Sequence, residues 1–282
     1  MALDNESLNH RMKIPPDSIY LDHNATTPVD ETVFARIVTI LKEDFGNPSS
    51  SYPLGIHARQ HVETSRREVA SLLGCRDHEV IFLSGGSEAN NTVLKGVVDL
   101  RDPGRHHIIT SAVEHPAVIH PAVFLMELGV EITILPVDPD GLIDPDDVQK
   151  AITPKTRLIS IMLANNETGT IQPIKDIARI AQENEIPIHT DAAQAVGKIP
   201  VNVNRLGVDF LTVAGHKLYA PKGIGALFIR EGRSLAPLIH GAGQEYGQRA
   251  GTENTALSTG LGTACRIARE RLKEDAPKIK AM

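Results

Sequence analysis

Lys217 is the residue of this chain best suited to covalent chemistry. It stands in the triplet Gly215-His216-Lys217, directly after an apolar run, Phe210–Ala214, that predicts a buried strand. Ligands of α/β proteins bind at the carboxyl ends of strands. A lysine amine at such an end can form a Schiff base with an aldehyde cofactor such as pyridoxal 5'-phosphate (PLP). The sequence therefore predicts a PLP site, whose remaining contacts other motifs must supply.

Two motifs suit anion binding and proton transfer. Ser84-Gly85-Gly86-Ser87 follows the predicted strand Val80–Leu83. Its small residues let the backbone approach a phosphate, and the next helix offers free N–H groups and a positive dipole end. Ser87 also suits an N-cap, so a simple capped helix is an equal alternative. Glu114-His115 follows the strand His107–Thr110; the histidine can stack on a flat ring or move protons, although a surface histidine at a helix start is commoner.

Two more strand ends carry amides and a carboxylate. Asn165-Asn166-Glu167 follows the predicted strand Leu158–Leu163, where a turn is the alternative because asparagine bonds its own backbone. Asp191 follows the strand Pro187–Thr190. A carboxylate is costly to bury unless it faces a cation, and in PLP enzymes it pairs with the pyridine nitrogen. A helix cap is the alternative for Asp191.

The order of the predicted elements explains how these motifs meet. Strands alternate with amphipathic helices, which predicts a mostly parallel sheet of the seven-stranded type with helices on both faces. The connection between Ala214 and the strand Gly225–Ile229 is too short for a helical crossover, so that strand is expected to be antiparallel. The helices are expected at residues 30–45, 57–73, 87–100, 115–128, 144–152, 174–184 and from 256 onward. In such a sheet the motif-bearing strand ends converge on one crevice.

Composition narrows the class of protein. The 282 residues are 41% hydrophobic and 23% charged, as in an ordinary globular protein. The formal net charge of −6 argues against nucleic acid as the main partner, and no apolar run predicts a membrane span. Cys75 and Cys265 are too few for a disulfide framework and lack metal-type spacing. Residues 1–18 resemble neither a secretory signal nor a transit peptide, which favours the cytoplasm.

Taken together, these residues resemble the class V aminotransferase family of PLP fold type I, in its cysteine desulfurase and selenocysteine lyase branch. The likeness spans about residues 20–260. The motifs that carry it are Tyr20-Leu21-Asp22-His23-Asn24-Ala25-Thr26-Thr27-Pro28, Gly46-Asn47-Pro48-Ser49-Ser50, Ser84-Gly85-Gly86-Ser87-Glu88, Glu114-His115, Asn165-Asn166-Glu167-Thr168-Gly169, Asp191-Ala192-Ala193-Gln194, Gly215-His216-Lys217 and Arg249-Ala250-Gly251-Thr252-Glu253-Asn254.

The resemblance implies a role for each matching residue. Lys217 would hold PLP and shuttle protons, and Asp191 would hold the pyridine nitrogen. His115 would stack on the ring and count with Lys217 as catalytic. The remaining cofactor contacts would come from Gln194 and Asn166 near the phenolic oxygen, from Gly86, Ser87 and His216 at the phosphate, and from Thr252 of a neighbouring subunit, which implies a homodimer. Ala214 stands where many members carry a serine that donates to the phosphate.

The resemblance also predicts the domain organisation. Residues 1–19 would be an N-terminal arm, 20–258 the PLP-binding large domain, and 259–282 the start of a helix leading to a small domain absent from this chain. In the family that small domain carries the catalytic cysteine and an arginine that binds the substrate carboxylate. Neither Cys75 nor Cys265 fits that role, so the sequence is expected to be a truncated form.

The implied activity is that of a PLP-dependent cysteine desulfurase. Such an enzyme removes sulfur from L-cysteine, giving L-alanine and an enzyme persulfide for a sulfur-acceptor protein and iron–sulfur cluster assembly. This chain is expected to perform the early steps without completing sulfur transfer. The alternatives are a selenocysteine lyase acting on L-selenocysteine, another class V aminotransferase or β-eliminating lyase, and a non-catalytic PLP-binding partner subunit.

Overall fold

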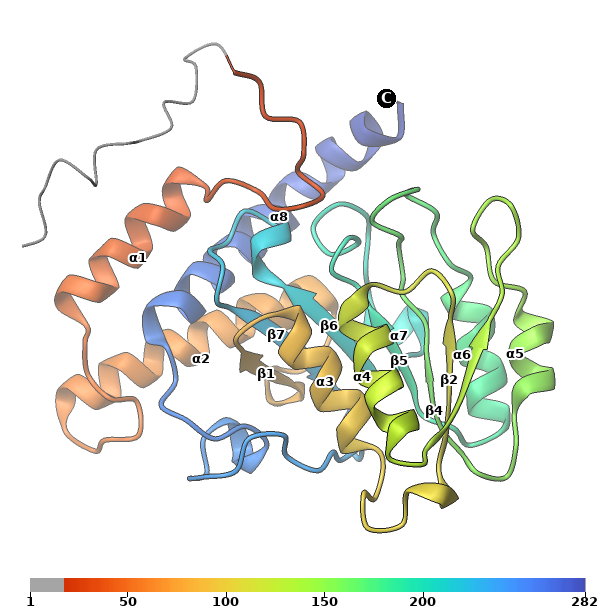
Figure 1. Cartoon of the computed structure of the whole chain (residues 1–282). Coiled ribbons are helices and arrows are strands. Elements are labelled where there is room, and N and C mark those ends of the chain that lie inside the picture. The colour runs from red at the N-terminus through yellow and green to blue at the C-terminus, as the bar shows by residue number, and fades with distance from the viewer. Residues whose placement is uncertain (1–17, 282) are drawn as a thin grey trace, which may run out of the picture.

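One seven-stranded sheet organises the protein (Figure 1). The computed structural model describes residues 18–281. The strand order is β1-β7-β6-β5-β4-β2-β3, and β7 alone runs antiparallel to its neighbours. The predicted antiparallel strand and the mostly parallel sheet are therefore confirmed. The strands are β1 (Val80–Leu83), β2 (His107–Ser111), β3 (Glu131–Leu135), β4 (Thr156–Ser160), β5 (Ile188–Asp191), β6 (Phe210–Ala214) and β7 (Gly225–Ile229).

Helices cover both faces of the sheet. All residues of the inner strands β2, β5, β6 and β7 are therefore buried. Neighbouring residues of β2, Ile108 and Ile109, enter different core clusters, as the two-residue period of a strand requires. The helices are α1 (Glu31–Glu43), α2 (Pro53–Leu73), α3 (Gly86–Gly96), α4 (Pro116–Glu127), α5 (Pro145–Ala151), α6 (Ile174–Glu183), α7 (Val203–Leu206) and α8 (Thr255–Ala281). One cluster contains residues of α3 and α4, and the other contains residues of α1, α2, α5, α6, α7 and α8.

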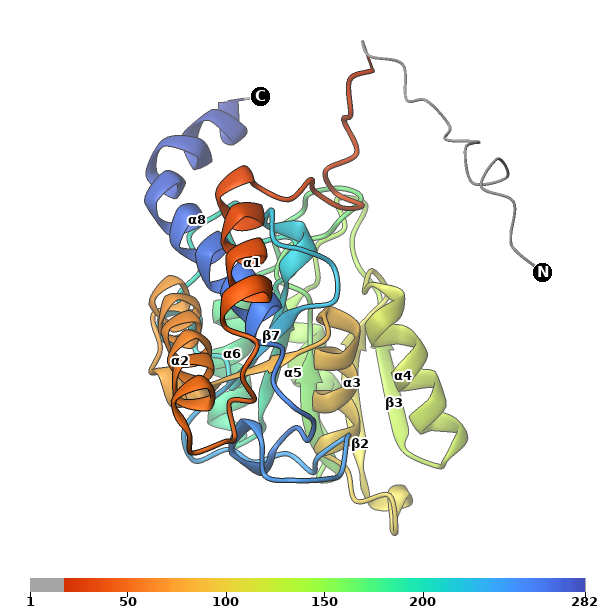
Figure 2. The same ribbon diagram turned by 90° about the vertical axis from the view of Figure 1, so that its left-hand side faces the viewer.

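Three long helices pack together beside the sheet. Figure 2 shows α1, α2 and α8 stacked at one side of the molecule, with α3 and α4 on the other side of the sheet. Small residues allow the close approach of these helices: a Cβ on Gly262 of α8 would lie only 2.5 Å from the Cα of Ser65 on α2. The buried Cys265 of α8 belongs to the same core cluster.

Several predicted boundaries were wrong by a few residues. β4 begins at Thr156 rather than Leu158, because the exposed Arg157 interrupts the apolar pattern at the start of the strand. α3 ends at Gly96 rather than Leu100. Its last carbonyl accepts a hydrogen bond from the Ala236 amide at 3.0 Å, a contact distant in sequence. α2 begins at Pro53, whose fixed φ angle suits the first turn of a helix.

The predicted domain divisions stay predictions. Most of the proposed N-terminal arm, residues 1–19, lies outside the described residues. α8 runs through position 258, the proposed end of the large domain, as one helix. Among residues 18–281, no helix is both long and apolar enough to cross a membrane. The cytoplasmic location also stays a prediction.

Candidate active site

A cavity of about 580 Å³ opens at the carboxyl ends of the parallel strands. This volume is within the range of small-molecule sites, roughly 300–1,000 Å³. Eight of the nine predicted site residues line it: Gly86, Ser87, His115, Asn166, Asp191, Gln194, His216 and Lys217. Thr252, in the loop before α8, does not line it. The convergence expected from a parallel sheet therefore exists within one chain for all of these residues except Thr252.

The loop between β1 and α3 presents backbone amides to the cavity. Gly85 is the N-cap of α3 with φ 155°, a conformation that favours glycine. A Cβ on Gly225 of β7 would lie 2.8 Å from the Gly85 backbone, so the bare Gly225 permits this close approach. No side chain caps α3, and Ser87 lies inside its first turn. The alternative of Ser87 as an N-cap was therefore wrong, and the first amides of α3 lack a side-chain acceptor.

Asp191 is a buried carboxylate at the end of β5. Its Oδ2 accepts a hydrogen bond from Asn90 Nδ2 at 2.6 Å and its Oδ1 accepts one from the Ala193 amide at 3.0 Å. Burial raises the pKa of Asp191, while these hydrogen bonds and the nearby His115 and Lys217 oppose that rise. A cation in the cavity would favour the charged form further. Asn90, fully buried on α3, was not predicted to have a role; its signal was a polar amide at a helix position facing the sheet.

His115 lies at the start of α4 and also lines the cavity. Its Nδ1 accepts a hydrogen bond from the Ala117 amide at 3.1 Å, so the side chain caps α4. The residue is exposed at the start of that helix, as the alternative of a surface histidine expected. The preceding Glu114 is buried, and its Oε1 accepts hydrogen bonds from Ser111 Oγ at 2.7 Å and from the Met162 amide at 2.8 Å. Burial raises the pKa of Glu114 to about 8, so the side chain is largely a neutral acid at pH 7.

The side chains of the two asparagines after β4 have different contacts. Asn165 forms a turn: its Oδ1 accepts hydrogen bonds from the amides of Glu167 at 2.8 Å and Thr168 at 2.9 Å. Asn166 lines the cavity instead, and its Nδ2 donates to Glu167 Oε1 at 2.6 Å. The turn alternative was thus right for the first asparagine, while the second lines the cavity.

Lys217 contacts a segment that lines the cavity through Ala25 and Thr26. We call residues 22–27 the strap. The ammonium of Lys217 donates to the carbonyls of Asn24 and Ala25, and Thr27 anchors the strap by donating to the His216 carbonyl through both its amide and its hydroxyl. Burial lowers the pKa of Lys217, against the opposing effect of carboxylates that include Asp191. A larger share of neutral amine is therefore available at Lys217 than on an exposed lysine.

Neither cysteine lies at the cavity. Cys75 is in the turn between α2 and β1, at the amino end of that strand. The cavity lies at the carboxyl ends of the strands, on the opposite side of the sheet. Cys265 is buried on α8. Burial raises the pKa of both thiols, to about 12 for Cys75. Thiolate is the nucleophilic form, so both residues are poorly reactive.

The sequence profile described as Aminotransferase class-V matches residues 19–280. The chain belongs to the class V aminotransferase family. Among curated relatives, the "Cysteine desulfurase IscS" of Dictyoglomus turgidum is 52% identical over 89% of this chain, and that of Methanosarcina thermophila is 46% identical over 91%. The chain spans 64% of the length of each of these relatives.

Solved structures of this family share the fold. A structure titled "NIFS-LIKE PROTEIN" has a TM-score of 0.90 and 40% identity, covering 93% of this chain and 73% of the other. A structure titled "SspA in complex with cysteine" has a TM-score of 0.86 and 42% identity, covering 88% of this chain and 72% of the other. The predicted likeness to class V aminotransferases and cysteine desulfurases is confirmed.

Class V aminotransferases and cysteine desulfurases depend on PLP, and the donor set of this cavity fits that cofactor. A pyridinium would form an ion pair with the buried carboxylate of Asp191, and a phosphate would accept hydrogen bonds from the uncapped amides of α3. Lys217 supplies an amine of lowered pKa. The cavity is also tight against added bulk at the phosphate end, because a Cβ on Gly86 would lie 3.3 Å from that of Ala214.

Proposed function

We propose that this chain is the PLP-binding part of a cysteine desulfurase that acts on L-cysteine. One observation carries the proposal: Lys217, just after β6, and Asp191, at the end of the adjacent β5, line the same cavity as the uncapped start of α3. Relatives up to 52% identical that are named cysteine desulfurase support this choice within the family. The complex of SspA with cysteine supports an amino-acid substrate.

Each side chain has a proposed contact with the cofactor. Lys217 would hold PLP covalently, and Asp191 would pair with its pyridine nitrogen. His115 would lie against the ring. The other proposed contacts are Gln194 and Asn166 near the phenolic oxygen and Gly86, Ser87 and His216 at the phosphate, all of which line the cavity.

The reaction would begin when the substrate amine replaces the amine of Lys217, which frees the lysine to accept the substrate α-proton. When bound, PLP supplies an electron sink for the electrons of the broken Cα–H bond. Lys217 takes this proton and returns it, because burial keeps the amine closer to its neutral form than on an exposed lysine. Asp191 would keep the pyridine nitrogen protonated, and the hydrogen bond from Asn90 fixes the carboxylate in place.

Sulfur transfer needs a thiolate at the substrate sulfur. Both thiols of this chain are away from the cavity and have raised pKa values. We therefore propose that this chain by itself activates the α-proton of cysteine without forming a persulfide. The selenocysteine lyase alternative differs only in the chalcogen and shares these steps.

A second copy of the chain completes the proposed site. Thr252 does not line the cavity of its own chain, and we propose that it contacts the phosphate in a partner subunit. We therefore propose that two copies of the chain form a homodimer, and that the complete reaction also needs a sulfur-acceptor protein.

Exchange of the substrate α-proton with solvent deuterium measures the early chemistry without sulfur transfer. The full chain is incubated with PLP and L-cysteine in deuterated water, and deuterium at Cα, sulfide, alanine and pyruvate are measured. We expect deuterium uptake without sustained sulfide or alanine release. Lys217→Ala should lose the exchange, whereas Lys175→Ala, at an exposed position on α6, should keep it. Absence of exchange in the wild-type chain would contradict the proposal, and pyruvate release would favour a β-eliminating lyase.

A further inference from the structure

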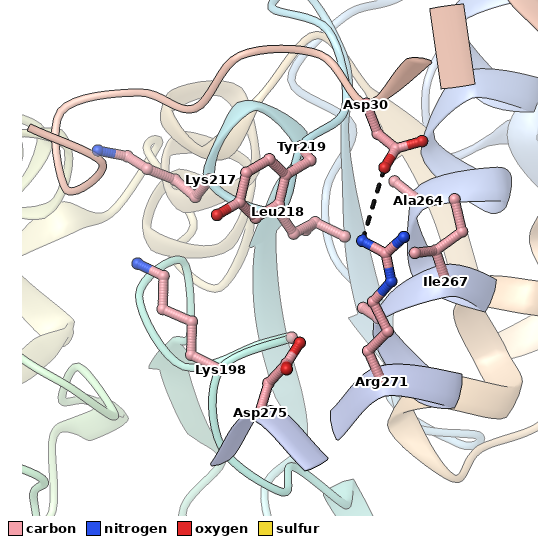
Figure 3. Close-up of a pocket in the computed structure, with 11 residues that line it drawn as sticks. Asp30, Lys198, Lys217, Leu218, Tyr219, Ala264, Ile267, Arg271 and Asp275 are labelled. Carbon is pink, nitrogen blue, oxygen red and sulfur yellow. Dashed lines mark ion pairs between the residues drawn. The ribbon is translucent and has the colours of Figure 1, made fainter. Parts of the chain in front are cut away.

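Lys198 is a second lysine beside the cofactor cavity. It lies in the connection after β5, four residues beyond Gln194, and is half-buried. Its ammonium donates to Gln194 Oε1. Figure 3 shows the side chains of Lys198 and Lys217 ending on the same side of a smaller cavity of about 70 Å³, which both residues line. None of the sequence motifs assigned a role to Lys198.

The hydrogen bond from Lys198 fixes the orientation of the Gln194 amide. Because an ammonium only donates, the amide oxygen must face Lys198 and the amide nitrogen must face the other way. Gln194 Nε2 indeed donates to the Asn24 carbonyl at 2.9 Å, and the same carbonyl accepts from Lys217. The two lysines are thus linked through one side chain and one strap carbonyl.

Lys198 is a cation that lines the same small cavity as Lys217. Burial, and then the charge of Lys217, lower the pKa of Lys198 to about 8, so most of it is protonated at pH 7. Across the smaller cavity lie Arg271 and Asp275 of α8 and Asp30 before α1. Arg271 and Asp30 are paired at 3.7 Å (Figure 3), which leaves Asp275 as the other carboxylate lining the cavity.

We infer that Lys198 is a positioning residue for the PLP site, and this rests on the proposed function. It holds the Gln194 amide with the N–H side toward the cofactor oxygen, and its positive charge favours the neutral amine of Lys217. Removing the charge should therefore raise the pH at which Lys217 becomes protonated, and removing the hydrogen bond should let the Gln194 amide turn.

The first test uses the cofactor-free full chain. The variants are Lys198→Met, which keeps the stem without the charge, and Lys198→Arg, which keeps the charge and a donor. Acetylation of Lys217 by a limiting acylating reagent at pH 7.5 is followed by peptide mass spectrometry. We expect about threefold slower labelling in Lys198→Met, because a lost neighbouring charge leaves less neutral amine. Lys198→Arg should remain within about twofold of wild type.

The second test uses the PLP-loaded protein. In Lys198→Met we expect the pH midpoint of the bound-cofactor absorbance to rise by about 0.5 unit or more, with no rise in Lys198→Arg. PLP affinity should fall about fivefold in Lys198→Met but by less than about twofold when Gln194→Ala is already present, because Lys198 acts through Gln194. Circular dichroism and thermal melting check that each variant folds.

The outcomes separate this inference from the proposed function. Labelling, midpoint and affinity that are all unchanged in Lys198→Met would overturn the inference while leaving the PLP site intact. Equal losses in Lys198→Met and Lys198→Arg would also overturn it, since packing rather than charge would then matter. A wild-type chain that takes up no PLP would overturn the proposed function, and the labelling of the cofactor-free chain would still decide the electrostatic role of Lys198.

Discussion

Asn90 of α3 donates a 2.6 Å hydrogen bond to Asp191 at the end of β5. The helix whose uncapped first turn lines the cavity thus also holds the buried carboxylate at the end of β5. Both groups are buried, so the bond is shielded from water. Its geometry fixes the distance between the two ends of the cofactor site before any ligand binds, and preorganisation of this kind lowers the cost of binding.

Replacing Asn90 should weaken PLP binding. Asn90→Ala leaves Asp191 Oδ2 without its donor, and we expect PLP affinity to fall roughly tenfold, as for a hydrogen bond to a charged group. Asn184→Ala, which removes an exposed amide at the end of α6, is the matched control and should bind PLP like wild type. Fluorescence titration of the cofactor-free proteins measures both affinities. Equal affinities for Asn90→Ala and wild type would exclude this role.

Glu114 should make stability depend on pH. Its pKa of about 8 lies above the ordinary value of 4.5, so its contribution is full below pH 4.5 and is lost as the pH rises through 8. Glu114→Gln cannot ionise and escapes this loss. We expect the unfolding free energy of the variant, relative to wild type, to rise by roughly 2–4 kcal/mol between pH 5 and 8.

Urea unfolding at several pH values tests this expectation. Glu127→Gln, at an exposed position at the end of α4, the helix that follows Glu114, is the control and should show no such trend. A difference between Glu114→Gln and wild type that does not change with pH would mean that Glu114 is ionised in the folded protein.

A buried ion pair holds the loop before α8. Arg66 Nη1 donates to Glu245 Oε2 at 2.6 Å, and that oxygen also accepts from the Phe82 amide at 3.0 Å. Glu245→Ala would leave the Phe82 amide without its acceptor and the buried Arg66 with only the more exposed Glu63 as an ionic partner, so we expect a loss of about 3 kcal/mol in the free energy of urea unfolding. Breaking the exposed pair of Arg76 and Glu231 by Arg76→Ala should cost less than about 1 kcal/mol. Similar losses in the two variants would contradict the buried character of the first pair.

Thr252 should act between subunits. If it contacts phosphate in a partner chain, Thr252→Ala alone should lower PLP affinity, and so should Lys217→Ala alone. Mixing the two variants under conditions that allow subunit exchange should restore tight PLP binding to one site in each hybrid dimer, which combines an intact Lys217 with an intact Thr252. Sedimentation measures the dimer and absorbance measures the bound cofactor. Tight binding by Thr252→Ala alone would remove Thr252 from the site.

The sequence predicted the strand ends well because each motif follows a short apolar run bounded by turn residues. A parallel sheet then brings Asp191 and Lys217 together without further information. The partners of these residues were not predictable. Asn90 is 101 residues from Asp191, and the Asn24 carbonyl is 193 residues from Lys217. Such contacts depend on the twist of the sheet and on the path of the strap, which leave no periodic pattern in the sequence.

Mapping the lysine that carries PLP tests the central claim most directly. The full chain is loaded with PLP, reduced with borohydride to fix the cofactor on its amine, digested and analysed by mass spectrometry. We expect the pyridoxyl group on Lys217, and none of it on any peptide of Lys217→Ala. Modification of Lys198 or Lys222 instead, or of no lysine that lines the cavity, would contradict the site as described.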